Sequence, residues 1–77
     1  MRPMEDPAMI RDHLAQAERH AAEGASRVAR QREIIQRLVK GGHDATEARE
    51  LLRQMEETQA LHVAGRERLR RELSDSA

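Results

Sequence analysis

The chain contains no Phe, Trp or Tyr among its 77 residues. Aromatic side chains dominate interface hot spots, stack on nucleic-acid bases and anchor proteins at membrane surfaces. Their absence argues against a nucleic acid or a membrane as the partner. Cysteine is absent too, so no disulfide can hold the fold together and no thiolate can serve as a nucleophile or a metal ligand.

The sequence also lacks an excess of charge of either sign and lacks any long apolar run. Its 14 basic and 14 acidic residues give a formal net charge of +0, so there is no electrostatic reason to expect a polyanionic partner. The segment Met1–Met9 has no apolar stretch, so we expect neither a signal peptide nor a membrane anchor there. These absences predict a cytoplasmic protein.

The few prolines and glycines divide the chain into two helical segments. Asp6 followed by Pro7 is a typical helix start, because aspartate caps exposed backbone N–H groups and proline suits the first helical position. The residues that follow are mostly strong helix formers, and Gly41 and Gly42 then end the segment. We therefore predict a first helix over about residues 7–40.

A second start signal follows at once. Asp44, with Glu47 three residues later, has the spacing of a capping box, in which each side chain satisfies the other's exposed backbone N–H group. This spacing predicts a second helix over about residues 45–73, followed by a polar tail over 74–77. The turn at 41–44 is so short that the helices must run antiparallel. We predict one all-α domain, a coiled-coil-like two-helix hairpin.

Both helical segments carry a heptad series, with steps that alternate between three and four residues. The first series is Ile10, Leu14, Ala17, Ala21, Gly24, Val28, Gln31, Ile35 and Leu38. The second series is Ala45, Ala48, Leu52, Met55, Gln59, His62, Arg66, Leu69 and Leu73. We call the two series the seam, and their antiparallel pairing places Ala21 opposite His62. The polar members Gln31 and Gln59 are interpreted as residues that fix the register at some cost in stability.

Further apolar residues lie outside the seam, namely Met9, Ile34, Val39, Leu51, Leu61 and Val63. An apolar stripe wider than one seam is typical of a helix with more than one neighbour, and two helices alone bury little apolar surface. We therefore predict a homodimer, a four-helix bundle of two hairpins, with another helical protein as the alternative partner. The residues assigned to the seam and the dimer contact are Ile10, Leu14, Ala21, Val28, Ile34, Ile35, Leu38, Leu51, Leu52, Met55, Leu61, His62, Leu69 and Leu73.

The four histidines are the candidates for a chemical site. His13 and His20 lie about 10.5 Å apart along a helix, too far to share a metal ion. His62 lies one position from His20 across the pairing, so these two side chains are the ones that could meet. We interpret His62 as a hydrogen-bonded seam residue and predict no metal site and no cofactor, with His20 and His62 as the candidate ligands if a metal does bind. A metal or ligand sensor that uses His13, His20 and His62 is the alternative function.

Catalysis has little support in the sequence. Ser26, Thr46 and Thr58 have no recognisable base near them, and no glycine-rich loop is present that could cradle a phosphate. We therefore predict a non-enzymatic module that self-associates and serves a structural or protein-interaction role.

Three segments carry a resemblance to a group of proteins. They are RQREIIQRL at Arg30–Leu38, GHDATEARELL at Gly42–Leu52 and EETQALHVAGRERLRREL at Glu56–Leu73. Through them, the stretch from Leu14 to Leu73 resembles small uncharacterised helical-hairpin proteins of alpha-proteobacteria. The resemblance implies a bacterial cytosolic protein and assigns no activity to any residue.

Overall fold

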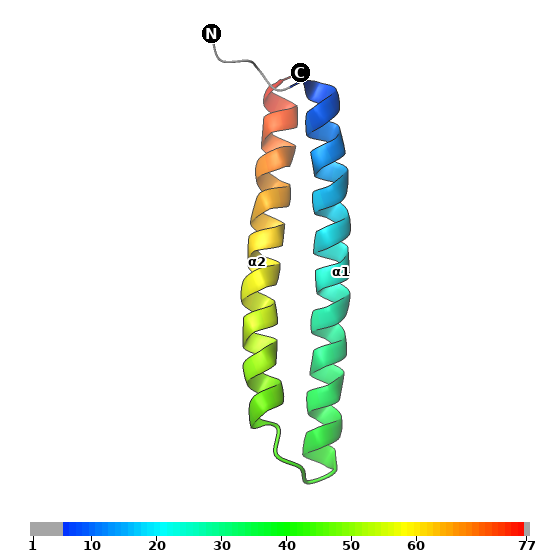
Figure 1. Ribbon diagram of the computed structural model, residues 1–77, viewed down its shortest axis with the longest axis vertical. Coiled ribbons are helices and arrows are strands. Elements are labelled where there is room, and N and C mark those ends of the chain that lie inside the picture. Colours follow the sequence, from blue (N-terminus) through cyan, green and yellow to red (C-terminus); the bar gives the residue numbers. More distant parts are fainter. Residues whose placement is uncertain (1–5, 77) are drawn as a thin grey trace.

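The computed structural model describes residues 6–76, and it consists of two long helices. Helix α1 (Pro7–Lys40) and helix α2 (Thr46–Asp75) lie side by side in opposite directions (Figure 1). They pack against each other along their length, so the predicted helical hairpin is confirmed. The molecule is a rod with extents of 61 × 18 × 13 Å. Neither helix has a stretch long and apolar enough to cross a membrane.

Helix α1 begins with the predicted cap. The Asp6 carboxylate accepts a hydrogen bond of 3.0 Å from the backbone N–H of Ala8, and Pro7 occupies the first helical turn. The bond satisfies one of the N–H groups that a helix start leaves without an intrahelical acceptor. Residues 1–5 of the segment Met1–Met9 lie outside the described part of the chain.

Helix α1 ends in a Schellman motif, in which a residue with positive φ closes the last turn. Gly42 has φ +74° and is that residue. The backbone N–H of His43 donates to the carbonyl of Leu38 at 2.9 Å, and the N–H of Gly42 donates to the carbonyl of Val39 at 3.1 Å. These are the two bonds that define the motif. Gly41, by contrast, has an ordinary φ of −82°.

The capping box predicted for Asp44 and Glu47 is wrong. The structure makes Ala45 the N-cap residue, so Asp44 lies one position too early and Glu47 is the second helical residue instead of the third. Among residues 6–76, no hydrogen bond joins the two side chains to each other's backbone. The Asp44 carboxylate instead accepts from the hydroxyl of Thr46 at 2.6 Å and from its backbone N–H at 2.9 Å, and these bonds lower the pKa of the carboxyl.

Helix α2 also ends later than predicted. Ser74 and Asp75 are helical, so only Ser76 of the predicted polar tail 74–77 follows the helix within the described residues, and Ala77 lies outside them. The Ser76 hydroxyl donates to the carbonyl of Leu73 at 2.9 Å. This bond adds a second donor to a carbonyl of the last helical turn, which already accepts from the backbone N–H of Ser76, and such bonds stabilise a helix end.

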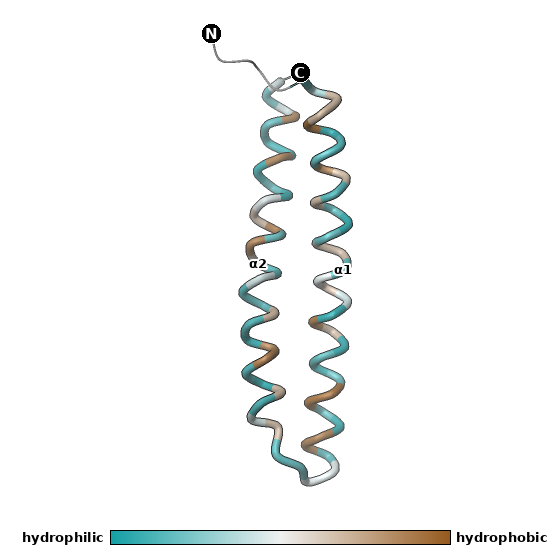
Figure 2. Tube along the Cα trace, viewed as in Figure 1, coloured by the Kyte–Doolittle hydropathy of each residue, from teal (hydrophilic) through white to brown (hydrophobic). Residues whose placement is uncertain are grey.

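The core lies along the seam and is thin. Every residue of both seam series is buried or half-buried, and hydrophobic residues recur along the sides on which the two helices face each other (Figure 2). Of the residues that the structure describes, only Ile10, Ala21, Val28, Gln31 and Ala45 are buried. No described side chain is completely enclosed, because a single layer of two helices covers each seam residue from one direction only.

Candidate functional site

Two glutamines tie the helices together across the seam. The Gln31 amide of α1 donates to the carbonyl of Ala48 at 2.9 Å, and the Gln59 amide of α2 donates to the carbonyl of Ala21 at 2.7 Å. The bonds run in opposite directions between the helices, so sliding one helix along the other would break both. They support the interpretation of these glutamines as residues that fix the register.

A glycine makes room for one of these bonds. A Cβ atom added to Gly24 would lie only 1.8 Å from the Oε1 atom of Gln59. The Gln59 amide therefore reaches across the seam because the facing position of α1 has no side chain. Gly24 breaks the helix-forming pattern of α1 at the one place where the pairing needs space.

One broad side of the hairpin carries the ion pairs that join the helices. Arg32 pairs with Glu56 at 2.8 Å, and Glu18 pairs with Arg70 at 3.2 Å. Each of these four residues directly follows a seam residue in the sequence. Successive helix residues are rotated by about 100°, so residues that follow the seam share one side of both helices. We call this side the ion-paired face.

Residues that directly precede a seam residue lie on the opposite side, which we call the open face. The large hydrophobic side chains exposed there are Met9, Ile34, Leu51 and Leu61. Leu61 is 73% exposed. Val39 is the remaining exposed large hydrophobic residue of the described chain, and it follows a seam residue, so it lies on the ion-paired face. The exposed large hydrophobic residues are thus concentrated on one side. Val63, the last of the apolar residues outside the seam, directly follows His62 and lies half-buried on the ion-paired face.

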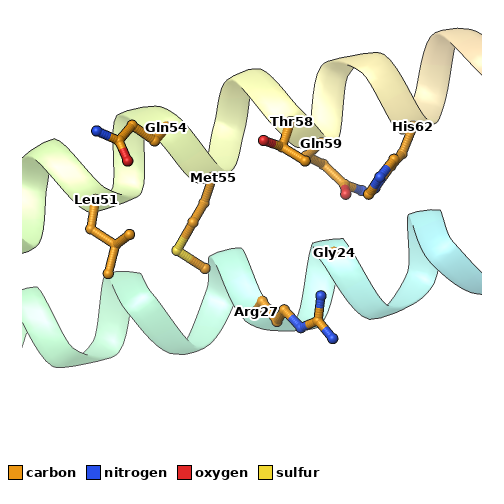
Figure 3. Close-up of a pocket in the computed structure, with 8 residues that line it drawn as sticks. All are labelled: Gly24, Arg27, Leu51, Gln54, Met55, Thr58, Gln59 and His62. Carbon is orange, nitrogen blue, oxygen red and sulfur yellow. The ribbon is translucent and has the colours of Figure 1, made fainter.

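Shallow cavities mark the open face. One of ≈ 270 Å³ is lined by Gly24, Arg27, Leu51, Gln54, Met55, Thr58, Gln59 and His62 (Figure 3). Two neighbouring cavities continue along the same face, one at His20, Glu23, Arg27 and His62 and the other at Ala17, His20, Leu61, His62, Gly65, Arg68 and Leu69. Each of these lining residues belongs to the seam or directly precedes it. The middle of the open face is therefore a row of three hollows, and His62 lines all of them.

Two histidines meet in this row of hollows. The ring centres of His20 on α1 and His62 on α2 lie 5.9 Å apart, and the ring planes are tilted by 40°. The sequence placed these residues one position apart across the pairing, and the structure brings them together. His13 and His43 are exposed and lie elsewhere along the hairpin.

His62 was expected to be hydrogen-bonded, and for its Nδ1 atom this expectation is wrong. The Nδ1 atom of His62 is buried and has no hydrogen-bond partner, and the same is true of Oε1 of Gln59. The two residues are separated by about one helical turn on α2 and line the same cavity. In Figure 3 both side chains extend from α2 toward the segment of α1 that carries Gly24. Buried polar atoms without partners are costly, so within residues 6–76 this pair is the site that calls for a chemical explanation.

The histidine pair falls short of a complete metal site. Within residues 6–76, no group of three or more His, Cys, Asp or Glu side chains is arranged to hold a metal ion. Two imidazoles are nevertheless chemically suited to zinc, nickel or copper. The arrangement offers two nitrogen ligands, one from each helix.

The remaining predicted residues divide into two groups. The seam residues Ile10, Leu14, Ala21, Val28, Ile35, Leu38, Leu52, Met55, Leu69 and Leu73 lie between the helices, whereas Ile34, Leu51 and Leu61 are exposed on the open face. The sequence reasoning missed the cross-helix pairs Arg32–Glu56 and Glu18–Arg70. The register contains the signal for them, because each pair joins residues that directly follow facing seam positions.

Comparison with protein-family models, curated proteins and solved structures gives no match to this chain. The resemblance to alpha-proteobacterial helical-hairpin proteins therefore stays a prediction.

Proposed function

We propose that this chain is a non-enzymatic structural module that self-associates through its open face, with two hairpins forming a four-helix bundle. The observation that supports the proposal is the one-sided distribution of exposed apolar residues. Met9, Ile34, Leu51 and Leu61 lie on one broad face, and cross-helix ion pairs lie on the other. Exposed large apolar residues that gather on one face of a protein often mark an interaction site.

The thin core supplies the energetic reason. Of the buried residues, Ala21 and Ala45 are small and Gln31 is polar, which leaves Ile10 and Val28 as the larger apolar side chains. Folding stability from burial grows with the apolar area removed from water, at roughly 25 cal/mol per Å². A second layer of helices would cover the exposed side of the half-buried seam residues such as Met55 and add the area that a single hairpin lacks.

The open face is large enough for a stable dimer. A broad face spans the two longest extents of the rod, 61 and 18 Å, and its footprint exceeds the roughly 800 Å² that each partner contributes to a stable interface. A two-fold axis brings the same surface of both copies together, so apolar residues of one copy meet apolar residues of the other. The formal net charge of +0 leaves no overall repulsion between the copies.

Sedimentation or light scattering at micromolar concentration tests the proposal. We expect twice the 8.8 kDa mass of one chain, and a melting temperature that rises with protein concentration. Leu51→Glu should produce the mass of one chain, because a carboxylate in an apolar interface must be desolvated without a partner. A wild-type chain that is folded and has the mass of one chain would overturn the proposal.

Val39→Glu is the matched control. Val39 is 52% exposed and Leu51 is 48% exposed, and both lie near the turn, but they lie on opposite faces. We expect Val39→Glu to keep the mass of a dimer. The reverse result, in which Val39→Glu dissociates the dimer and Leu51→Glu does not, would assign the interface to the ion-paired face. Binding of another helical protein in place of a second copy would appear as a wild-type monomer that associates only with that partner.

A further inference from the structure

We propose that His20 and His62 together bind a divalent transition-metal ion of the zinc class on the open face, and that the ion clips α1 to α2. The site needs only one hairpin, so it goes beyond the proposed self-association and does not depend on it. It rests on the position of the two rings, on the unpaired atoms beside them and on the cavity that they share.

The spacing of the rings suits one shared ion. The ring centres lie 5.9 Å apart and come from different helices. Zinc binds an imidazole nitrogen at about 2.0 to 2.1 Å, so two rings on one tetrahedral ion have centres on the order of 5 to 6 Å apart. His20 is exposed and free to turn about its side-chain bonds, whereas His62 is half-buried in the seam. A rotation of the His20 ring therefore completes the geometry without moving the backbone.

The unpaired atoms explain how His62 would be held as a ligand. Its Nδ1 atom and the Oε1 atom of Gln59 are both buried without a partner. The two atoms are not bonded to each other in the structure. A turn of the His62 ring that lets an N–H group at Nδ1 donate to Oε1 would satisfy both. The proton would then be fixed on Nδ1, which leaves the lone pair on Nε2 available for a metal. Metal-binding histidines commonly donate their second N–H to a protein acceptor in this way.

Gln59 is itself held in place for this role. Its Nε2 atom donates to the carbonyl of Ala21 at 2.7 Å, so the amide cannot rotate without losing a cross-helix bond. The amide occupies the space opposite Gly24. The side chain that would orient His62 is therefore anchored to the helix that carries His20.

The charges around the pair set the strength of the site. Glu23 lines the cavity that contains both rings, and its carboxylate favours a cation, whereas Arg27 in the same cavity and Arg68 in the neighbouring one oppose it. No third protein ligand is in place among residues 6–76 of one chain, so in a single hairpin water would complete the coordination shell. Such a two-histidine site selects metals that prefer imidazole, namely zinc, nickel and copper, over magnesium and calcium, which prefer oxygen ligands.

A metal that needs both helices stabilises the hairpin, because it binds the folded chain better than the unfolded one. We expect Zn²⁺ or Ni²⁺ added to the full chain at neutral pH to raise the melting temperature by several degrees, and EDTA to reverse the rise. Mg²⁺ at the same concentration should have no effect. Calorimetric titration should show that His20→Ala and His62→Ala each lose at least tenfold in affinity for Ni²⁺.

His13→Ala and His43→Ala are the matched controls, since each removes an exposed histidine that lies away from the pair. Both should keep the full metal response. His62→Gln keeps a polar side chain in the seam and should fold even if His62→Ala does not, and it should also lose the response. A metal response that is absent from the folded wild type, or that survives in His20→Ala, would overturn the inference. Both proposals use the open face, so the mass and the metal response are measured on the same sample. A monomer with an intact metal response overturns the proposed function alone, and a dimer overturns this inference alone when neither it nor its Leu51→Glu monomer responds to the metal.

Discussion

The two broad faces of the hairpin are made by the same two helices, yet their side chains are used differently. On the ion-paired face, Arg32–Glu56 and Glu18–Arg70 join α1 to α2 and leave Val39 as the exposed large hydrophobic residue. On the open face, no described ion pair joins the helices. That face instead exposes four large hydrophobic residues and the row of hollows around His62.

The difference shows how a heptad pattern can carry two kinds of information. The seam positions specify that two helices pair and in which register. The positions on either side of the seam then specify what each face can meet. Charged pairs on one face are already partnered and well hydrated, so covering them would require their desolvation. Apolar residues on the other face are exposed to water without compensation, so covering them is favourable.

The largest effect should come from a charge placed in the seam instead of on a face. Val28 is 7% exposed, and Val28→Asp would bury a carboxylate without a partner, at a cost of about 3 kcal/mol or more. We expect this variant to lose its helical circular dichroism signal. Leu61→Asp places the same charge on the open face, and it should keep that signal while losing the dimer mass. If Leu61→Asp unfolds as well, the open face is needed for folding itself, and the distinction between seam and face fails.

The sequence predicted the hairpin because three independent signals agreed. The Asp6–Pro7 start, the glycines at the turn and the two heptad series all favour the same pairing of helices, and local and global preferences that agree specify a structure well. Asp44 shows where such reasoning fails. The helix start lies one residue later than the capping box requires, so Asp44 and Glu47 do not form the box. Helix ends are uncertain by one or two residues on sequence grounds.

The candidate site was predictable only in part. Sequence spacing placed His20 near His62, but the unpaired state of Nδ1 depends on side-chain packing around Gln59 and Gly24, which no periodicity specifies. The placement of the exposed large hydrophobic residues on one face could have been predicted from the sequence. Met9, Ile34, Leu51 and Leu61 each directly precede a seam residue, and this order alone assigns them to one face once the pairing is antiparallel.

The turn joins the two helices in the register that forms both faces, and the positive φ of Gly42 closes that turn. A residue other than glycine at its φ of +74° is disfavoured by about 1 to 2 kcal/mol, and a β-branched residue by more. Urea denaturation should show this loss for Gly42→Val. Gly42→Asn should lose less stability than Gly42→Val, because asparagine tolerates positive φ. Equal stabilities for wild type and Gly42→Val would contradict the Schellman motif.

A glycine on the open face offers a gain in stability. Gly65 lies in α2, and nothing lies within 4 Å of a Cβ atom added there. Gly65→Ala should stabilise the chain by about 0.5 to 1 kcal/mol, the usual penalty of glycine in a helix. Gly24→Ala is the contrasting variant. It should not gain stability, because the added Cβ would displace the Gln59 amide. If Gly65→Ala lowers the stability, and does so only at concentrations at which the dimer forms, then the backbone of the second copy lies close to Gly65. That result would identify Gly65 as part of the dimer interface on the open face.

The smallest effect is expected on the ion-paired face, and its size tests whether that face remains in water. The side chains of Arg32 and Glu56 are 59% and 46% exposed, so a double-mutant cycle with Arg32→Ala and Glu56→Ala should give a coupling of about 0.5 kcal/mol or less. The coupling should fall further as salt is added, because exposed charges are screened. Coupling between charges rises when water is excluded from them. A coupling well above 1 kcal/mol that resists salt would therefore mean that a second copy covers the ion-paired face, and the roles assigned to the two faces would have to be exchanged.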